Sequence, residues 1–356
     1  MKTLRNLIAI LFLSLAACRT VETSPQPTLP VEDQIRPVQQ SEDYVLSGLT
    51  ENEVATLLSL TEIDAYPLYT MHYYASYDKL ADLQPAYAYP LGANVSWACS
   101  LFAALSNPEN QLYGRNFDWE YSPALLLFTD PSDGYASTTM VDIAYLGFTG
   151  DQSRNLSEKP LQELVSLLDA PYIPFDGINE AGLVIGMAAV PAGKVPTDPL
   201  KDTLGSLGII RVVLDNAANV DEALEIFRSY NIDFGGGPPI HYLIADAGGN
   251  AALFEHYQGE VYVFHNQALW QQATNFLNAS VESPFDQCWR YDTMEKRLAA
   301  VQGNLRPDEA MRLLQDVSQD STQWSVVYNI SLGDIHVVMG RNYGNEHVLS
   351  FERAVP

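Results

Sequence analysis

The chain has 356 residues, enough for two average domains or for one large domain with an N-terminal extension. Apolar residues make up 47% of it, which can build a sizeable core, so a wholly disordered chain is excluded. The 19 Lys and Arg against 44 Asp and Glu give a formal net charge of −25. This balance argues against nucleic-acid binding, because a phosphate backbone needs a basic face. Three cysteines are too few for a disulfide scaffold, and they do not match the spacings of a zinc site.

The N-terminus has the pattern of a secretory signal. Two basic residues precede an apolar run over Leu7–Leu15 that is too short to span a bilayer. Leu-Ala-Ala-Cys follows at residues 15–18 and resembles the lipobox of bacterial lipoproteins, in which the cysteine is acylated and becomes the new N-terminus. We therefore predict a signal peptide over residues 1–17, a lipid anchor at Cys18 and an extracytoplasmic, membrane-anchored protein. The alternative is an ordinary cleaved signal in which this cysteine is incidental.

Residues 18–40 follow the signal. They are rich in proline and have no periodic apolar residues, which predicts a lipid anchor and flexible tether. The block that follows, residues 41–98, has a helical apolar pattern over residues 51–63. Its tyrosines are spaced by three and four, which predicts an aromatic helix face that packs in the core. The alternative is a lip for an apolar substrate. These tyrosines are Tyr66, Tyr69, Tyr73, Tyr74 and Tyr77.

Beyond Trp97, short strand-like runs and helical stretches alternate. This order indicates a mixed fold in which helices are layered on antiparallel sheets. Glycine-rich turns at residues 248–250 and 258–259 divide a strand meander. Asp221 and Pro307 are expected at helix starts, as N-cap and in the first turn. We predict strands within 111–119, 124–131, 137–148, 182–191, 238–264 and 322–351, and helices over 208–217, 221–229, 291–301 and 307–317.

Several familiar catalytic signatures are absent. The sequence has no G-x-S-x-G elbow, Walker loop, G-x-G-x-x-G or H-E-x-x-H motif. Its six histidines are scattered singly, and His241, in an apolar run, is interpreted as a hydrogen-bonded core histidine rather than a ligand. A Cys–His catalytic pair is possible, but no motif supports it.

Cys99 has a sequence context that suggests catalysis. It begins an apolar strand, and Gly-Arg-Asn-Phe-Asp-Trp follows at residues 114–119. A strand, a turn and a returning strand of this length would bring Arg115 and Asp118 beside Cys99. A guanidinium favours the thiolate, and a carboxylate can hold a proton-accepting amine. The alternatives are a structural cysteine and a strand-end salt bridge between Arg115 and Asp118.

These residues resemble the N-terminal nucleophile (Ntn) hydrolases of the choloylglycine hydrolase, penicillin V acylase and acid ceramidase group. In that group a cysteine is followed by G-R-N-F-D-W at this distance. Asn-Glu-Ala-Gly-Leu at residues 179–183 is similar to the family's N-E-x-G-L turn, and Thr-Asn-Phe at residues 274–276 is similar to its T-N motif. Arg290 stands where the family places a second arginine.

The resemblance implies an α/β (α+β) protein with a four-layer αββα sandwich of two antiparallel sheets. It also implies that residues 41–98 form an N-terminal helical pro-segment and that residues 99–356 form the catalytic domain. Autocatalytic cleavage of the Ala98–Cys99 bond would separate the two. No metal and no organic cofactor is implied.

The resemblance also assigns roles to residues. Cys99 would be the nucleophile and its freed α-amine the general base for its own thiol. Asp118 would orient that amine, Arg115 would position the thiolate and the substrate carbonyl, and Arg290 would support the site electrostatically. Asn275 would donate to the oxyanion, with Asn266 as the alternative donor. Asn179 is interpreted as a turn residue.

The predicted function is hydrolysis of the linear amide C–N bond of an N-acylated small molecule through a thioester acyl-enzyme. Bile-salt and penicillin acylases have an asparagine where this chain has Ala189, which favours ceramidase-like or other acylases. Leu125–Phe128 and the tyrosine-rich segment would suit a fatty or aryl acyl group. The oligomeric state is not predicted, and Cys288 is left without a role, although pairing with Cys99 would abolish the mechanism.

Two alternatives come from other functional classes. One is a non-catalytic lipoprotein, a binding module on the same fold with a disused site. The other is a cysteine peptidase or transpeptidase in which His241 or His256 is the base.

Overall fold

The computed structural model describes residues 48–77, 98–191, 195–235 and 237–351, and all of these fall in the compact unit Asp43–Pro356. The predicted signal peptide, Cys18 and the tether lie outside the described residues. None of the described helices is long and apolar enough to cross a membrane.

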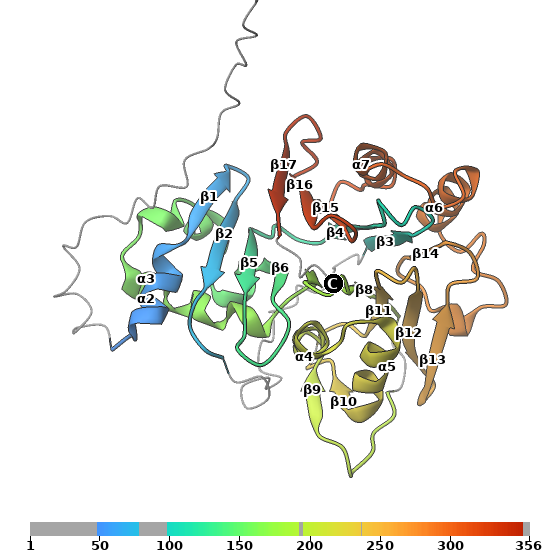
Figure 1. The fold of residues 1–356 in the computed structure, drawn as a ribbon, viewed down its shortest axis with the longest axis horizontal. Helices are drawn as coiled ribbons and strands as arrows, with labels where there is room; N and C mark the ends of the chain where they lie inside the picture. Colours follow the sequence, from blue (N-terminus) through green and yellow to red (C-terminus); the bar gives the residue numbers. More distant parts are fainter. Residues whose placement is uncertain (1–47, 78–97, 192–194, 236, 352–356) are drawn as a thin grey trace, which may run out of the picture. The chain divides into compact units, whose positions relative to one another are not determined.

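A nine-stranded sheet forms the larger of two stacked layers (Figure 1). All its neighbouring strands are antiparallel except β2 and β5, which run parallel. In order across the sheet, its strands are β1 (Thr61–Asp64), β2 (Leu68–Tyr73), β5 (Ala124–Thr129), β6 (Ser137–Asp142), β7 (Asp176–Asn179), β8 (Val184–Ala189), β11 (Ile240–Ala245), β12 (Ala251–Tyr257) and β13 (Glu260–His265).

A six-stranded, fully antiparallel sheet forms the second layer. It packs on the first sheet through β3, which contacts β8 and β11. In order, its strands are β14 (Trp270–Ala273), β3 (Ala98–Ala104), β4 (Leu112–Asp118), β15 (Thr322–Asn329), β16 (Asp334–Met339) and β17 (Glu346–Ser350). A small parallel pair is formed by β9 (Thr203–Gly205) and β10 (Asn231–Asp233).

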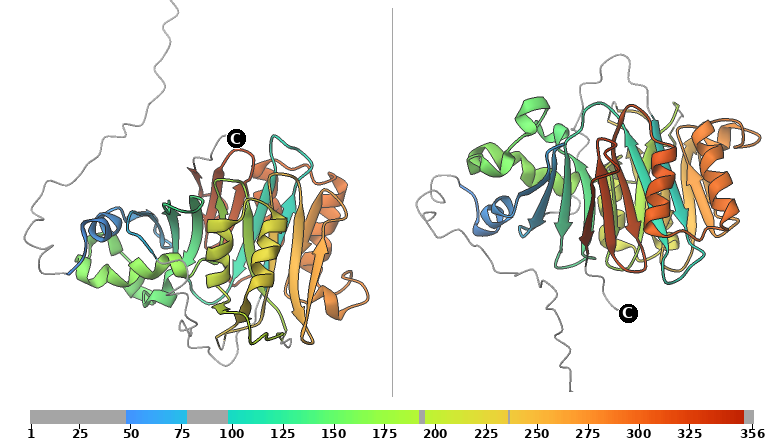
Figure 2. Two further views of the ribbon diagram at one scale, coloured as in Figure 1. Left: turned by 60° about the horizontal axis from the view of Figure 1, so that its bottom comes forward. Right: turned by 90° about the horizontal axis from the view of Figure 1, so that it is seen from above.

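Two pairs of helices cover the outer faces and complete the four layers (Figure 2). Helices α4 (Gly208–Asn216) and α5 (Val220–Ser229) pack on β7, β8, β11 and β12 of the larger sheet. Helices α6 (Trp289–Ala300) and α7 (Pro307–Asp316) pack on β14, β3, β4 and β15 of the smaller sheet. The predicted αββα sandwich is therefore confirmed.

The remaining described helices are short. A capping box from Thr50 starts α2 (Glu51–Leu58), because Thr50 and Glu53 satisfy each other's backbone N–H groups. The others are α3 (Leu161–Leu164) and the 3₁₀ helices η1 (Ile143–Leu146), η2 (Gly150–Ser153), η3 (Leu156–Glu158), η4 (Val165–Tyr172) and η5 (Asn278–Ser280).

Two local predictions are wrong. The block before Cys99 is not wholly helical, because after α2 the described chain forms β1 and β2 within the larger sheet. Tyr69 and Tyr73 therefore lie on a strand. Both are buried, as the predicted core packing requires, whereas Tyr74 is exposed. A spacing of four residues fits one helical turn and also two strand repeats, so it did not distinguish a helix from a strand. The N-cap of α5 is Asn219, whose side chain accepts the Glu222 N–H, and not Asp221.

Candidate active site

Strand β3 places Cys99 beside the returning strand β4. In this ladder Cys99 lies opposite Phe117, Leu101 opposite Arg115, and Ala98 opposite Asp118. Alternate residues of a strand face the same side, so the Cys99 and Arg115 side chains share one face of the sheet and Asp118 faces the other. The spacing correctly predicted that β4 would bring Arg115 and Asp118 to the strand next to Cys99.

Cys99 is buried, and only 4% of its surface is exposed. Burial raises the pKa of its thiol, although Arg115, Arg290 and the Asp118 N–H all favour the thiolate. Arg115 favours the thiolate, as expected from its place beside Cys99, but burial outweighs this effect.

Two side chains hold the backbone of Cys99 and also contact each other. Its N–H donates to Asn275 Oδ1 at 2.6 Å, and its carbonyl oxygen accepts from Arg290 Nη1. Arg290 Nη2 also donates to Asn275 Oδ1, at 2.9 Å. Asn275 and Arg290, far apart from Cys99 in sequence, therefore meet at the nitrogen and the carbonyl of that residue.

The orientation of the Asn275 amide follows from its partners. Cys99 N–H and Arg290 both donate, so the amide oxygen must face them. The amide nitrogen then donates to the Ala189 carbonyl at 2.7 Å. An NH₂ group carries two hydrogens, and one is left for another acceptor.

Asp118 lies behind Cys99 and bonds to side chains outside the ladder. Its carboxylate accepts hydrogen bonds from Thr322 Oγ1 and from Gln319 Nε2, and Arg290 Nη1 is 3.9 Å away. Burial raises the pKa of Asp118 to about 6, although these bonds and Arg290 favour the charged form. In the uncleaved chain, the group that contacts the Cys99 nitrogen is thus Asn275, and Asp118 reaches the site through Arg290.

Arg115 is fully buried and is fixed by a partner that the sequence did not reveal. It donates from Nη1 to the Asp176 carboxylate and from Nε to the Met187 carbonyl at 3.1 Å, and Asp176 also accepts from Tyr328. Burial disfavours the Arg115 charge, but Asp176 outweighs it and the pKa of Arg115 is raised. The sequence signal that could have pointed to this partner is Asp176 itself, an acidic residue in the apolar run before the N-E-x-G-L motif.

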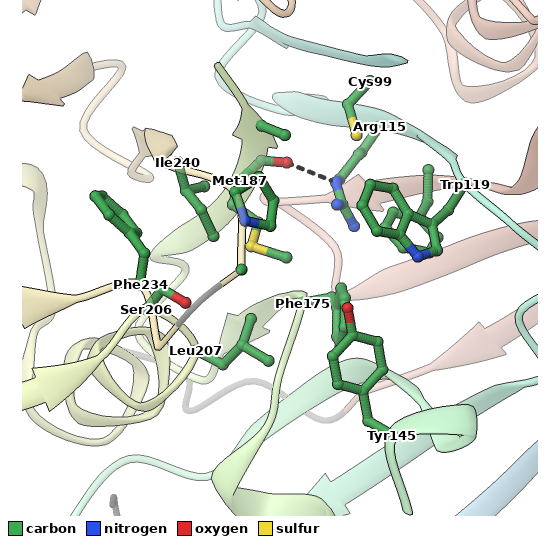
Figure 3. A pocket seen from close by; sticks show the side chains of 14 residues that line it. Cys99, Arg115, Trp119, Tyr145, Phe175, Met187, Ser206, Leu207, Phe234 and Ile240 are labelled. Carbon is green, nitrogen blue, oxygen red and sulfur yellow. Dashed lines mark hydrogen bonds between the residues drawn. The ribbon is translucent and has the colours of Figure 1, made fainter. Parts of the chain in front are cut away.

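An apolar pocket opens beside the Cys99 thiol, with about 650 Å³ of space, part of it open to solvent (Figure 3). The Arg115 guanidinium projects into this pocket, and its Nη2 has no hydrogen-bond partner among the described residues. Leu125–Phe128, which we expected to form a wall, do not line it. The lining residues are Cys99, Arg115, Phe117, Trp119, Tyr145, Phe175, Met187, Ala189, Ser206, Leu207, Phe234, Gly237, Pro238 and Ile240.

Two other asparagines have structural partners. Asn179 holds its own turn by accepting from the Leu183 N–H, and it donates to the Leu214 and Ala217 carbonyls. It is the turn residue that the sequence indicated. Asn266 accepts from the Ala251 N–H at the start of β12 and donates to the Ala268 carbonyl after β13, and it does not bond to Cys99, so the structure brings Asn275 rather than Asn266 to the site.

The two histidines considered as catalytic bases do not line the pocket. His241 Nδ1 lies 2.9 Å from Glu255 Oε1 in the core, which confirms the predicted core histidine. Burial lowers the pKa of His256 to about 4. No contact joins either ring to Cys99, and this geometry gives no support to a Cys–His pair.

Cys288 caps helix α6 near the site. Cys99 and Cys288 are both free thiols, so the pairing that would abolish the mechanism is not formed. Burial raises the pKa of Cys288, but Arg290 and the first N–H groups of α6 outweigh it, so the pKa is lowered overall. Among the described residues, no group of three or more His, Cys, Asp or Glu side chains is placed to hold a metal ion.

The sequence matches a known protein family over the region that builds this site. Residues 99–279 match the family model described as linear amide C-N hydrolases, choloylglycine hydrolase family. The chain belongs to this family. It is therefore a hydrolase that acts on linear amide carbon–nitrogen bonds.

Solved structures support the fold of this choloylglycine-family hydrolase. A mutant of conjugated bile acid hydrolase from Clostridium perfringens is 16% identical, with 71% of this chain and 92% of that chain covered and a TM-score of 0.51. A second variant of that enzyme is 14% identical, with the same coverage and a TM-score of 0.50. At such identities the likeness shows the fold alone.

Proposed function

We propose that this hydrolase uses Cys99 as its nucleophile and removes the acyl group from an N-acylated small molecule. One observation carries the proposal. The Cys99 thiol lines an apolar pocket while the nitrogen and carbonyl of the same residue are held by Asn275 and Arg290. A substrate whose acyl group filled the pocket would present its carbonyl carbon to this thiol.

Self-cleavage would first free the α-amine of Cys99. The thiol attacks the carbonyl carbon of Ala98, the Ala98–Cys99 C–N bond breaks, and the thiol proton passes to the departing nitrogen. Water then hydrolyses the thioester, which leaves a carboxyl group on Ala98 and restores the thiol. Asn275 Oδ1 already accepts from this nitrogen in the uncleaved chain, so the new amine forms next to an acceptor.

In turnover the α-amine is the general base. With an ordinary pKa of about 8 it can take the thiol proton while sulfur attacks the substrate carbonyl. It then returns the proton to the departing amine, and water releases the acid from the thioester. The raised pKa of the buried Cys99 thiol fits this order, because the proton leaves only when a base accepts it.

Asn275 is the proposed oxyanion donor. Its second amide hydrogen is not needed by Ala189 and can meet the negative oxygen of the tetrahedral intermediate. One such donor contributes about 3–4 kcal/mol to the transition state. Arg115, fixed by Asp176, would place a charge beside the substrate carbonyl, and Arg290 would keep the Cys99 backbone in position.

Asp118 is the proposed partner of the freed amine. Ala98 lies opposite Asp118 in the β3–β4 ladder, so cleavage of the Ala98–Cys99 bond would free the amine close to the Asp118 carboxylate. An ionised Asp118 would then orient the new α-amine.

We also propose a fatty or aryl acyl group, because aromatic and aliphatic side chains make up most of the pocket lining. Acylation of Cys18 and an extracytoplasmic membrane location are proposed from the N-terminal sequence pattern alone.

The test is to trap the acyl-enzyme. Purified protein is incubated with an N-acyl amino acid, an N-acylethanolamine, penicillin V and a conjugated bile acid, quenched in acid and mapped by mass spectrometry. We expect an added acyl mass on Cys99 that is lost in Cys99→Ala and retained in Cys288→Ala, the matched control. An adduct on Cys288, or hydrolysis that persists in Cys99→Ala, would contradict the proposal.

A further inference from the structure

A buried carboxylate holds the loop that carries Asn275. Glu255, on β12, is completely buried. Its Oε1 accepts the N–H of Asn278 and its Oε2 accepts the N–H of Ala279, both at 3.0 Å. These two residues begin η5, directly after the turn that contains Asn275. Glu255 thus satisfies two consecutive N–H groups that the start of a 3₁₀ turn leaves free.

His241 fixes Glu255 in turn. It lies on β11, the strand next to β12, and its Nδ1 is 2.9 Å from Glu255 Oε1. Both Glu255 oxygens already accept backbone N–H groups, so we assign the carboxyl group as the acceptor and Nδ1 as the donor in this contact. His241 is 1% exposed and its Nε2 has no hydrogen-bond partner among the described residues. The ring therefore has one polar contact, and that contact restrains the carboxylate.

The loop crosses between the two sheets. It leaves β14, which pairs with β3 of the smaller sheet, and it is bound to the larger sheet at two points. One is the Asn275 Nδ2 bond to Ala189 on β8, and the other is Glu255 on β12. Cys99 lies on β3, so the distance from the nucleophile to Asn275 depends on how the larger sheet holds this loop.

We propose that Glu255, restrained by His241, is a positioning residue that sets Asn275 against Cys99. It touches neither substrate nor nucleophile and acts through the backbone of residues 275–279. This proposal rests on the proposed oxyanion role of Asn275. Without Glu255, two buried N–H groups would lose their acceptor and the turn would relax away from β12.

The test separates positioning from general stability. Glu255→Gln keeps the size but puts an NH₂ against a backbone N–H. His241→Leu removes the donor, whereas His241→Asn keeps one near the position of Nδ1. The matched control is Asp246→Asn, because Asp246 is another buried carboxylate that accepts backbone N–H groups, at the opposite end of the β11–β12 hairpin.

Each variant is assayed for hydrolysis of the substrate found by trapping, for thermal unfolding, and for alkylation of Cys99 by iodoacetamide. Alkylation forms no oxyanion, so loss of the oxyanion donor alone should not slow it. For Glu255→Gln and His241→Leu we expect a fall in kcat of about tenfold or more, with KM and the alkylation rate within about twofold of wild type. His241→Asn should recover most of kcat, and Asp246→Asn should lower the unfolding temperature without lowering kcat.

A double-mutant cycle completes the test. If Glu255 acts through Asn275, Glu255→Gln should have little further effect on kcat in an Asn275→Ala background. Full additivity, a wild-type kcat in Glu255→Gln, or an equal loss of kcat and alkylation would overturn the positioning role. Failure of the proposed function has a different signature, because wild-type protein would then hydrolyse substrate after complete alkylation of Cys99.

Discussion

The segment 48–77 and the β3–β4 hairpin lie on opposite sides of the proposed cleavage bond, yet both belong to the same core. Strand β2 pairs with β5 along its whole length, from Leu68–Ala124 to Tyr73–Thr129. Tyr69 and Met71 on β2 are fully buried. The hairpin carries the unfavourable features of the site instead, a buried thiol and a carboxylate of raised pKa. The earlier segment thus stabilises the folded chain, whereas the buried thiol and carboxylate of the hairpin destabilise it in exchange for a reactive site.

This difference bears on what cleavage would do. Contacts other than the peptide chain join the earlier segment to the rest, including Tyr66 to Gln323 at 2.7 Å and Tyr73 to the Leu168 carbonyl at 3.0 Å. Asp64 also contacts His347 at 2.7 Å, across from β1 to β17. We therefore expect the two pieces to remain associated after the Ala98–Cys99 bond is cut.

The largest expected effect comes from breaking the buried face of β2. Tyr69→Ala removes a fully buried ring and its hydroxyl bond to the Ser153 carbonyl, at 2.7 Å. We expect a loss of about 3–5 kcal/mol in the free energy of unfolding, measured by denaturant titration of the uncleaved Cys99→Ala chain. Cleaved protein with this change should separate into two pieces on size-exclusion chromatography.

The control for that experiment is Tyr74→Ala, since 54% of the Tyr74 surface is exposed. It should cost less than about 1 kcal/mol. Equal losses for the two variants would show that β2 does not join the segment to the core.

An intermediate effect is expected from the buried Asp118 carboxyl, which should make the stability of the folded chain depend on pH. The pKa of Asp118 is raised to about 6 from 3.8, so the folded chain binds this proton more tightly than the unfolded chain. Stability should therefore fall as pH rises from about 3 to about 7, by about 3 kcal/mol relative to Asp118→Asn. Both chains are compared in the Cys99→Ala background by denaturant titration at each pH. If the free energy of unfolding changes with pH in parallel for the two chains, the Asp118 carboxyl does not destabilise the folded chain.

The smallest effect concerns Tyr77, the last residue of the described segment 48–77. The Tyr77 hydroxyl donates to Asp215 at 3.1 Å, and its ring lies 5.7 Å from the Arg211 guanidinium. Tyr77→Phe keeps the ring and should lower the free energy of unfolding by about 1–2 kcal/mol. Tyr74→Phe is the matched control and should change nothing measurable. A Tyr77→Phe chain as stable as wild type would mean that this contact does not hold the end of the segment.

The sequence predicted the parts of the site that depend on local spacing. Cys99, Arg115 and Asp118 lie on one strand–turn–strand unit, so their separation predicts their proximity. The four longer helices behind the sheets were also expected, because their apolar residues follow a helical period.

Long-range partners were beyond local spacing. The residues around Asp176 do not indicate that it pairs with Arg115, and those around Glu255 do not indicate His241. Both pairs arise from the strand order in the folded sheets. Likewise, the sequence gives Asn275 a motif but not its contact with the Cys99 nitrogen. Strand β2, before Cys99, was missed because tyrosines spaced by four fit a strand as well as a helix.

The central claim is that Cys99 becomes an N-terminal nucleophile, and the most direct measurement is the intact mass of the purified full chain and of Cys99→Ala. The account predicts that the wild type yields one piece that ends at Ala98 and one that begins at Cys99, and that Cys99→Ala stays in one piece. An active wild-type chain that remains joined through the Ala98–Cys99 bond would contradict it.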